Sequence, residues 1–299
     1  MLWGVQGISV VVLIIMAPLV LGITQVVKAR LQGRRGPSLW WGYWVLAKTW
    51  GKETTVPEYS SWIFRVAPSI SLAAMILVAG TIPWAGRVPN SWPHDLLTLF
   101  FLLALERFWV GLAGLDSAGT FGGLGSSRIT TLGAGIEPAL FAAFGVLWAV
   151  SGCTTISTVV GHLSLLPWGM AAVSYGLVML AELGRLPIDN VDTHLELTMM
   201  HEATVLEYNG RLLAENQAAI AVKYTAMLGL GWVWLSPSLE SPWITAVLHL
   251  SEIMVTAAIV GGIESRFAKL RYFQIPTYLA MASGLGLLAF YLMMTGGLN

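Results

Sequence analysis

Residues 3–27 read WGVQGISVVVLIIMAPLVLGITQVV and contain no charged side chain. The hydrocarbon core of a bilayer accommodates about 20 apolar residues of one α-helix, so this run is long enough to cross it. The first charges of the chain, Lys28 and Arg30, follow the run, whereas a signal peptide carries positive charges before its apolar stretch. We therefore expect residues 3–27 to form a retained membrane span.

Further apolar runs of similar length follow at about residues 64–85, 95–114, 129–150, 165–184, 216–236, 242–263 and 275–295. Hydrophobic residues make up 56% of the 299 residues and charged residues 11%, against roughly 25% charged residues in an ordinary soluble domain. This composition excludes a disordered chain and an ordinary soluble domain. The sequence predicts an all-α, polytopic integral membrane protein with eight transmembrane helices in a single domain, residues 1–299.

Basic residues mark one side of this predicted bundle. Nearly all of the 16 Lys and Arg residues lie in the odd-numbered loops, at about residues 28–63, 115–128, 185–215 and 264–274. Cytoplasmic loops carry the excess of Lys and Arg, so we expect these loops in the cytoplasm and both termini on the outer, periplasmic side of a prokaryotic inner membrane. Tryptophans near the outer span ends would form an aromatic belt (Trp84, Trp92, Trp168, Trp234 and Trp243).

The segment 38–52 combines four tryptophans with Lys48 and Lys52. A helix of this composition suits the membrane–water interface, with its apolar face toward lipid or protein. We expect an interfacial helix here, on the cytoplasmic side.

Charge balance and cysteine content restrict the function. Lys plus Arg and Asp plus Glu both number 16, and a formal net charge of zero excludes a nucleic-acid binder. The single cysteine, Cys153, cannot form a disulfide within the chain or hold an iron–sulfur cluster or a nickel–iron centre. Any redox metal that this protein serves must lie on a partner chain.

Ionisable groups at membrane depth cost several kcal/mol and point to function by default. Structural roles are equally open for some of them, because Glu106 and Arg107 could each pair with another span and Lys223 could extend to the interface. Pro138 loosens the backbone beside Glu137, which favours a functional role there. The full set of candidates at this depth is Glu106, Arg107, Glu137, Glu182, Lys223, His249 and Glu252, the last two sharing a helix face.

The fifth loop and its approach, residues 182–210, read ELGRLPIDNVDTHLELTMMHEATVLEYNG. Unlike the other cytoplasmic loops this one is acidic, and Asp189, Asp192 and Glu196 follow a spacing that would align them on one helix face. Clustered, partly buried carboxylates raise one another's pKa, as a proton relay requires, and His194 and His201 could join it. A solvated acidic loop that docks a basic partner explains the spacing equally well. A metal site is a weaker third interpretation, since no ligand motif such as HExxH is present.

Four motifs, in this order, resemble those of a known family: LQGRRGP at 31–37, KTWGKETTVP at 48–57, ELGRLPID at 182–189 and EYNG at 207–210. The family is the membrane subunit shared by respiratory complex I, as its subunit 1/H, and the group 4 membrane-bound [NiFe]-hydrogenases, including formate hydrogenlyase. The resemblance covers nearly the whole chain.

Finer features resemble the hydrogenase branch. These are GLDS at 114–117 with Phe121, GSSR at 125–128, IEP at 136–138, and Glu264 with Ala268, Arg271 and Tyr272. Quinone-reducing relatives carry two further glutamates where this chain has Asp192 and His194, and their segment between Glu196 and Glu207 is about three residues shorter. These differences argue against a quinone-reducing cavity.

The resemblance implies a membrane anchor that carries a line of carboxylates, often called the E-channel, and does no bond chemistry alone. The matching relay positions are Glu137, Glu182, Asp189, Asp192, Glu196 and Glu207. Counter-charges flanking the docking surface would be Arg34, Arg35, Arg128 and Arg185. The implied partners are hydrogenase-like large and small subunits and an Fe–S subunit on the cytoplasmic face, and antiporter-like subunits in the bilayer. Fe–S clusters and a NiFe centre would lie on those partners, with no cofactor or metal on this chain.

Three other functions remain open at this point. A quinone-site subunit of an NADH or ferredoxin dehydrogenase predicts a cavity for a quinone tail near the first span. A secondary transporter using Glu137 and Glu182 is disfavoured because no inverted repeat is visible. A scaffold without any proton role is the fourth possibility.

Overall fold

The computed structural model describes residues 2–86, 94–151, 154–156, 165–189, 199–236, 239 and 241–296. Within these residues the chain is helical, apart from turns and one isolated bridge between Asp95 and Thr155. The helices are α1 (Leu2–Leu31), α2 (Trp41–Trp50), α3 (Trp62–Thr81), α4 (Leu96–Asp116), α5 (Thr120–Ser151), α6 (Leu165–Glu182), α7 (His201–Val205), α8 (Gly210–Leu235), α9 (Pro242–Arg266), a short 3-10 turn η1 (Tyr272–Gln274) and α10 (Ile275–Gly296).

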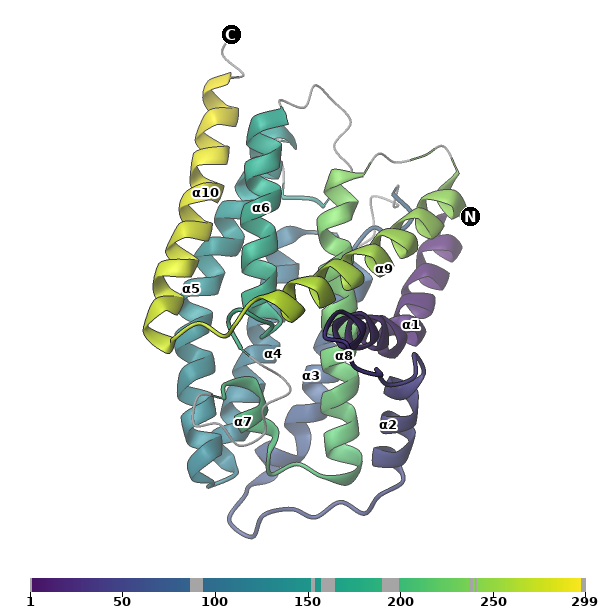
Figure 1. The fold of residues 1–299 in the computed structure, drawn as a ribbon, viewed down its shortest axis with the longest axis vertical. Coiled ribbons are helices and arrows are strands. Elements are labelled where there is room, and N and C mark those ends of the chain that lie inside the picture. The colour runs from purple at the N-terminus through teal and green to yellow at the C-terminus, as the bar shows by residue number, and fades with distance from the viewer. Residues whose placement is uncertain are drawn as a thin grey trace.

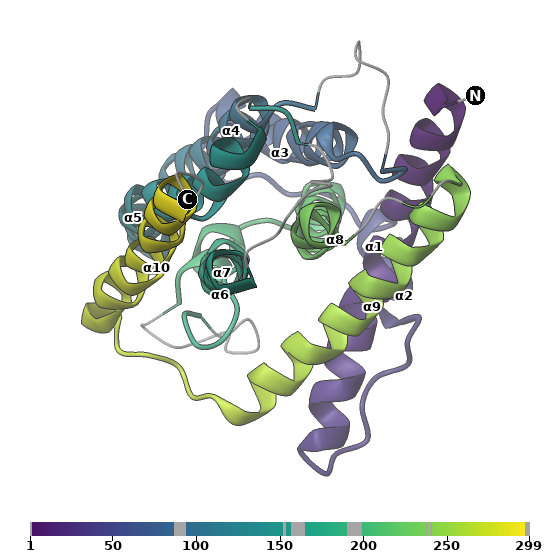
Figure 2. The ribbon, with the colours of Figure 1, turned by 90° about the horizontal axis from the view of Figure 1, so that it is seen from above.

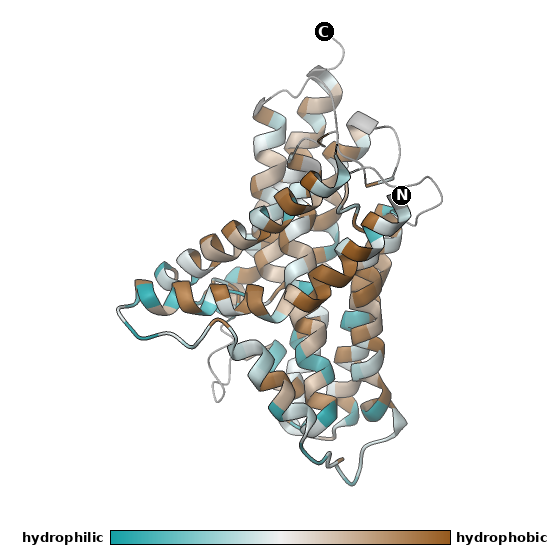
Figure 3. Cartoon of the chain, turned by 90° about the vertical axis from the view of Figure 1, so that its right-hand side faces the viewer, coloured by the Kyte–Doolittle hydropathy of each residue, from teal (hydrophilic) through white to brown (hydrophobic). Residues whose placement is uncertain are grey.

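The long helices alternate in direction along one axis, with α1 and α9 strongly tilted and crossing each other (Figures 1 and 2). Each expected span corresponds to one of them, and the expected interfacial helix is α2, whose tryptophans Trp41, Trp44 and Trp50 are exposed. Hydrophobic residues cover the middle of the molecule, and hydrophilic residues gather toward its lower end (Figure 3). The all-α membrane architecture is therefore confirmed.

Within the described residues, six helices are long and apolar enough by themselves to cross a membrane: α1, α3, α4, α5, α9 and α10. The other two expected spans, α6 and α8, lie inside the ring that these helices form (Figure 2). An enclosed helix can carry charged side chains because its neighbours, rather than lipid, surround them. This position explains why α8 contains the buried side chains Glu215 and Lys223.

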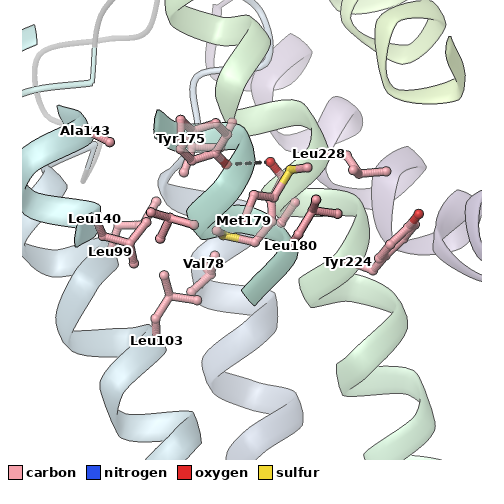
Figure 4. Packing of buried hydrophobic residues seen from close by; sticks show 14 of the residues in the cluster. Val78, Leu99, Leu103, Leu140, Ala143, Tyr175, Met179, Leu180, Tyr224 and Leu228 are labelled. Carbon is pink, nitrogen blue, oxygen red and sulfur yellow. Dashed lines mark hydrogen bonds between the residues drawn. The ribbon is translucent and has the colours of Figure 1, made fainter. Parts of the chain in front are cut away.

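The core lies where α6 and α8 meet α3, α4 and α5. Leu99, Leu103 and Leu140 face Tyr175 and Met179 there, and the Tyr175 hydroxyl donates a hydrogen bond of 2.6 Å to the carbonyl of Met227 (Figure 4). Since this oxygen belongs to the backbone of α8, the hydrogen bond ties α6 directly to α8.

Two local expectations are wrong. The expected loop 115–128 is mostly the beginning of α5, which starts at Thr120. Trp84 and Trp168 are buried in the bundle rather than placed in an aromatic belt, whereas Trp243 is exposed as expected. Asp189 follows a series of turns after α6, and the helix face expected for Asp189, Asp192 and Glu196 stays a prediction because the last two lie outside the described residues. Trp92, Cys153, Asp192, His194, Glu196 and the side chain of Trp234 lie outside the described residues.

Candidate functional site

Five ionisable side chains from four helices meet at membrane depth, and we call this group the charge network. Two come from consecutive positions of α4 and one each from α5, α6 and α8: Glu106, Arg107, Glu137, Glu182 and Lys223. Because consecutive residues of a helix point about 100° apart, the two α4 side chains reach different neighbours. The expectation that each of them pairs with another span is confirmed.

Arg107 and Lys223 connect the three carboxylates into a line. Arg107 Nη1 lies 2.8 Å from Glu137 Oε1, and its Nη2 lies 2.5 Å from Glu182 Oε2. Lys223 Nζ lies 2.8 Å from Glu182 Oε1 and 2.9 Å from Glu106 Oε2. Glu182 therefore holds both cations at once and stands at the centre of the line.

Burial differs along this line. Glu182 is 2% exposed and Glu106 and Lys223 are 7% exposed, so the lysine does not extend to the interface. The Glu137 side chain is 51% exposed and lines a groove of about 300 Å³ between α4 and α5. The network has three acids and two bases, so it can take up one proton and become electrically neutral. Burial makes the neutral state more favourable than it would be in water.

A glycine makes room for the arginine. A Cβ added at Gly133 of α5 would lie 2.7 Å from Arg107 Cδ, closer than real side-chain contacts allow. The absence of a side chain at this position therefore lets the guanidinium cross α5 and reach Glu137.

A small cavity extends the charge network toward the fifth loop. Its volume is about 20 Å³, and its polar lining is Glu106, Arg107, Glu182, Lys223 and His201. A cavity of at least about 10–15 Å³ with several polar partners can hold one water molecule. His201, at the start of α7, is therefore within one water of the buried carboxylates.

On its other side His201 faces Asp189. The Asp189 carboxylate is 3.7 Å from His201 Nδ1 and 2.7 Å from Lys269 Nζ, and it accepts hydrogen bonds from the backbone N–H groups of Met200 and His201. Burial raises the pKa of Asp189, but His201 and Lys269 outweigh that effect and hold the pKa below its usual range. The raised pKa expected for the acidic loop is therefore wrong for Asp189.

Glu207 lies apart from the charge network, on the exposed side of the turn after α7. Its neighbour Tyr208 is buried, stacks on Phe64 with ring centres 4.0 Å apart and donates a hydrogen bond to the Phe64 carbonyl. Asn209 hydrogen-bonds Thr55 across the 51–61 connection. This motif therefore fastens the connection before α3 to the connection before α8, and Glu207 is exposed there.

The four expected counter-charges differ in how exposed their side chains are. Arg34 and Arg35 are exposed, as a docking surface requires, and Arg128 donates to the Met199 carbonyl and lies over Tyr272. Arg185 is only 4% exposed, and its guanidinium lies 3.2 Å from Glu264. Arg185 is therefore a buried counter-charge and not part of a docking surface.

The sequence indicated Arg107 and Lys223 as membrane-depth candidates and His201 as a possible relay member, but it gave no pairing role to Glu264 or Lys269. Membrane depth signalled the first two, but nothing local indicates which carboxylate each would meet. Asp192 and Glu196, with the candidate metal ligand His194, lie outside the described residues, so their relay and metal roles stay predictions.

The fold and the site define an all-helical membrane protein with ion-paired charges between four of its helices. The sequence profile of the NADH dehydrogenase family matches residues 5–295. The chain therefore belongs to the NADH dehydrogenase subunit 1/H family, and it has the role of a complex I-like membrane subunit.

Relatives refine this placement. The chain is 29% identical to hydrogenase-4 component C of Escherichia coli (strain K12) over 96% of its own length and 94% of the relative. It is 30% identical to formate hydrogenlyase subunit 4 of the same organism, over 95% and 96%. The H-type subunit of the NADH-quinone oxidoreductase of Polaromonas naphthalenivorans (strain CJ2) is 26% identical over 75% of this chain and 68% of the relative.

The fold also matches a solved structure of an archaeal respiratory membrane complex, the membrane-bound sulfane sulfur reductase. The TM-score is 0.83, with 98% of this chain and 99% of that chain covered, at 18% sequence identity. At this identity the match establishes the fold alone.

Proposed function

We propose that this chain is the membrane anchor and proton-relay subunit of a group 4 membrane-bound [NiFe]-hydrogenase or formate hydrogenlyase type of assembly. The observation that carries the proposal is the line of five ion-paired side chains centred on Glu182, which holds one more acid than base. The two E. coli relatives, components of hydrogenase-4 and formate hydrogenlyase, support the assembly type.

The proposed orientation has eight spans, with α6 and α8 crossing the membrane inside the bundle. The 26 residues of α8 extend about 39 Å, which is more than the hydrocarbon thickness. An even number of spans returns both termini to one side, and the basic loops support an outer position for that side in a prokaryotic inner membrane.

The proposed route begins in the fifth loop. Fixed in place by Lys269, the Asp189 carboxylate orients His201, which exchanges a proton across the water-sized cavity with Glu182 or Glu106. Arg107 then links Glu182 to Glu137. A proton entering the network removes its single excess negative charge, so arrival of the proton and rearrangement of the ion pairs are coupled.

The route leaves the chain at Glu137. A carboxylate with half its surface exposed in a membrane-spanning helix is unfavourable against lipid, so the α4–α5 groove requires a protein cover. We assign this cover to an antiporter-like membrane subunit. On the cytoplasmic face, Arg34, Arg35 and the exposed tryptophans of α2 offer a docking surface for the arm that would carry the Fe–S clusters and the NiFe centre.

The test is Glu182→Gln in the whole complex, purified and reconstituted in vesicles, with Glu182→Asp to retain the charge. The expected result is an assembled complex whose electron transfer to an artificial acceptor persists while redox-driven proton movement falls at least about tenfold, with partial recovery in Glu182→Asp. Exposed Glu58→Gln serves as the matched control. Full proton movement in assembled Glu182→Gln and Glu137→Gln would leave only the scaffold role.

A second candidate function has its own observation. A cavity of about 320 Å³ lies between α1, α2 and α8, where the quinone alternative predicts space for a tail. Apolar side chains such as Leu21, Val45 and Ile220 line it, and Arg185 and Glu202 supply charged groups. Its size fits a small-molecule site. Saturable binding of a photoreactive quinone, labelling α1 or α2 and inhibiting turnover, would favour this function over the relay.

A further inference from the structure

A second buried protonatable pair lies away from the charge network, on α9. His249 is completely buried, and the side chain of Glu252 is 15% exposed. His249 follows the first helical residue, Pro242, by seven positions, which places it about 10 Å along the helix. The neighbouring end of α8 is the end opposite to α7 (Figure 1), so the pair is far from the Asp189 side of the bundle.

Every contact of the pair has a defined direction. His249 Nδ1 is 2.9 Å from Glu252 Oε2, and the Ser236 hydroxyl, at the end of α8, donates to Glu252 Oε1. A carboxylate only accepts hydrogen bonds, so the Nδ1 of His249 carries the hydrogen. The Nε2 of the same ring is buried and has no hydrogen-bond partner among the described residues. In the neutral ring Nε2 carries a lone pair, so Nε2 is the atom that accepts a proton.

The charge balance of this pair differs from that of the charge network. In the network Arg107 and Lys223 are fixed cations, whereas no Lys or Arg among the described residues pairs with Glu252. The helices packed against α9 are α1 and α8. Lys28 of α1 pairs with Glu264, and Lys223 of α8 pairs with Glu106 and Glu182. Among the described residues, the basic side chain that pairs with Glu252 is His249.

We propose that His249 and Glu252 form a second proton-binding site of the chain. A proton from water forms a bond to His249 Nε2 and converts a buried pair of net charge −1 into a neutral ion pair; release reverses the step, and no other bond changes. Since burial disfavours an uncompensated carboxylate, the site has a physical reason to hold the proton. The side of the membrane with which this proton exchanges rests on the proposed orientation, whereas the binding of the proton does not.

Infrared difference spectroscopy of the whole complex between pH 5 and 9, with ring-labelled histidine, tests this site. The expected result is an imidazolium band that titrates reversibly and disappears in His249→Gln. In Glu252→Gln the midpoint shifts to lower pH by about one unit or more, because an amide cannot neutralise the imidazolium. Ser236→Ala shifts the midpoint to higher pH. The Glu252 carboxylate then loses a hydrogen-bond donor, so it is less stable without the positive charge of the imidazolium.

The exposed residue Ser251 provides the matched control on the same helix, since its hydroxyl bonds only to the Leu248 carbonyl. Ser251→Ala leaves the midpoint unchanged. The proposal is overturned if no such band titrates in the wild-type complex, or if Glu252→Gln and Ser236→Ala leave the midpoint where it is. Those two variants keep the histidine, so they decide the question even where His249→Gln fails to assemble.

Discussion

Nη2 of Arg107 lies 2.5 Å from Oε2 of Glu182, and this ion pair joins α4 to α6 at membrane depth. Removing one partner of a buried pair costs more than the pair itself contributes, because the remaining charge is left without compensation. Glu182 also holds Lys223, and Arg107 also holds Glu137. A change at one member of the charge network therefore alters the environment of all the others.

Gly133→Ala is expected to disturb the charge network without altering a charge. The added Cβ would lie 2.7 Å from Arg107 Cδ and 2.9 Å from Nη1, so the guanidinium must move away from Glu137 or Glu182. We expect a lower midpoint of thermal unfolding, although alanine has a higher helix propensity than glycine by about 1 kcal/mol. Gly123→Ala, in the same helix, is the control, because a Cβ there meets nothing within 4 Å. Equal stability of the two variants would contradict this role of Gly133.

His201→Gln is expected to slow proton movement and leave assembly intact. The amide can occupy the edge of the water-sized cavity but cannot exchange a proton near neutral pH. We expect redox-driven proton movement in reconstituted vesicles to fall by about 10²-fold. Glu202→Gln is the matched neighbour, since Glu202 lines the α1–α2–α8 cavity instead. A larger effect in Glu202→Gln than in His201→Gln would favour the quinone function.

Asp189 predicts a particular dependence of stability on pH. Its pKa is lower in the folded protein than in the unfolded chain, so its ionised form contributes stability at every pH above the unfolded value of about 3.9. That contribution is lost as the pH falls below this value toward the folded pKa. Asp189→Asn should therefore unfold at a lower temperature at pH 7 and show less additional loss below about pH 4. If the unfolding temperatures of wild type and Asp189→Asn fall in parallel as the pH decreases through this range, Asp189 is not stabilised by Lys269 and His201.

Asp116→Ala is expected to destabilise the start of α3. One carboxylate oxygen of Asp116 accepts hydrogen bonds from the N–H groups of Ser61, at 2.8 Å, and Phe64, at 3.0 Å. Losing a capping acceptor costs about 0.5–2 kcal/mol, measurable as a drop in the thermal unfolding midpoint. Asp116→Asn keeps an acceptor oxygen and should recover part of that loss. An unchanged midpoint in Asp116→Ala would mean that water replaces the cap fully.

The sequence alone was sufficient to place the long helices and the interfacial helix α2. Hydropathy is a property of consecutive residues, so the run 3–27 predicts α1 before any packing is known. Local chemistry also placed Glu106, Arg107 and Lys223 at membrane depth and put His249 and Glu252 on one helix face, which their 2.9 Å contact confirms.

Only the tertiary structure decided which charges meet. Glu182 and Arg107 are 75 positions apart, and Lys223 and Glu106 are 117 positions apart, so no local pattern could pair them. The same packing encloses α6 and α8, buries Trp84 and Arg185, and lowers the pKa of Asp189. The physical reason is that hydropathy accumulates residue by residue along the chain, whereas the partner, the burial and the protonation of a charged group depend on helices that come together only in the folded bundle.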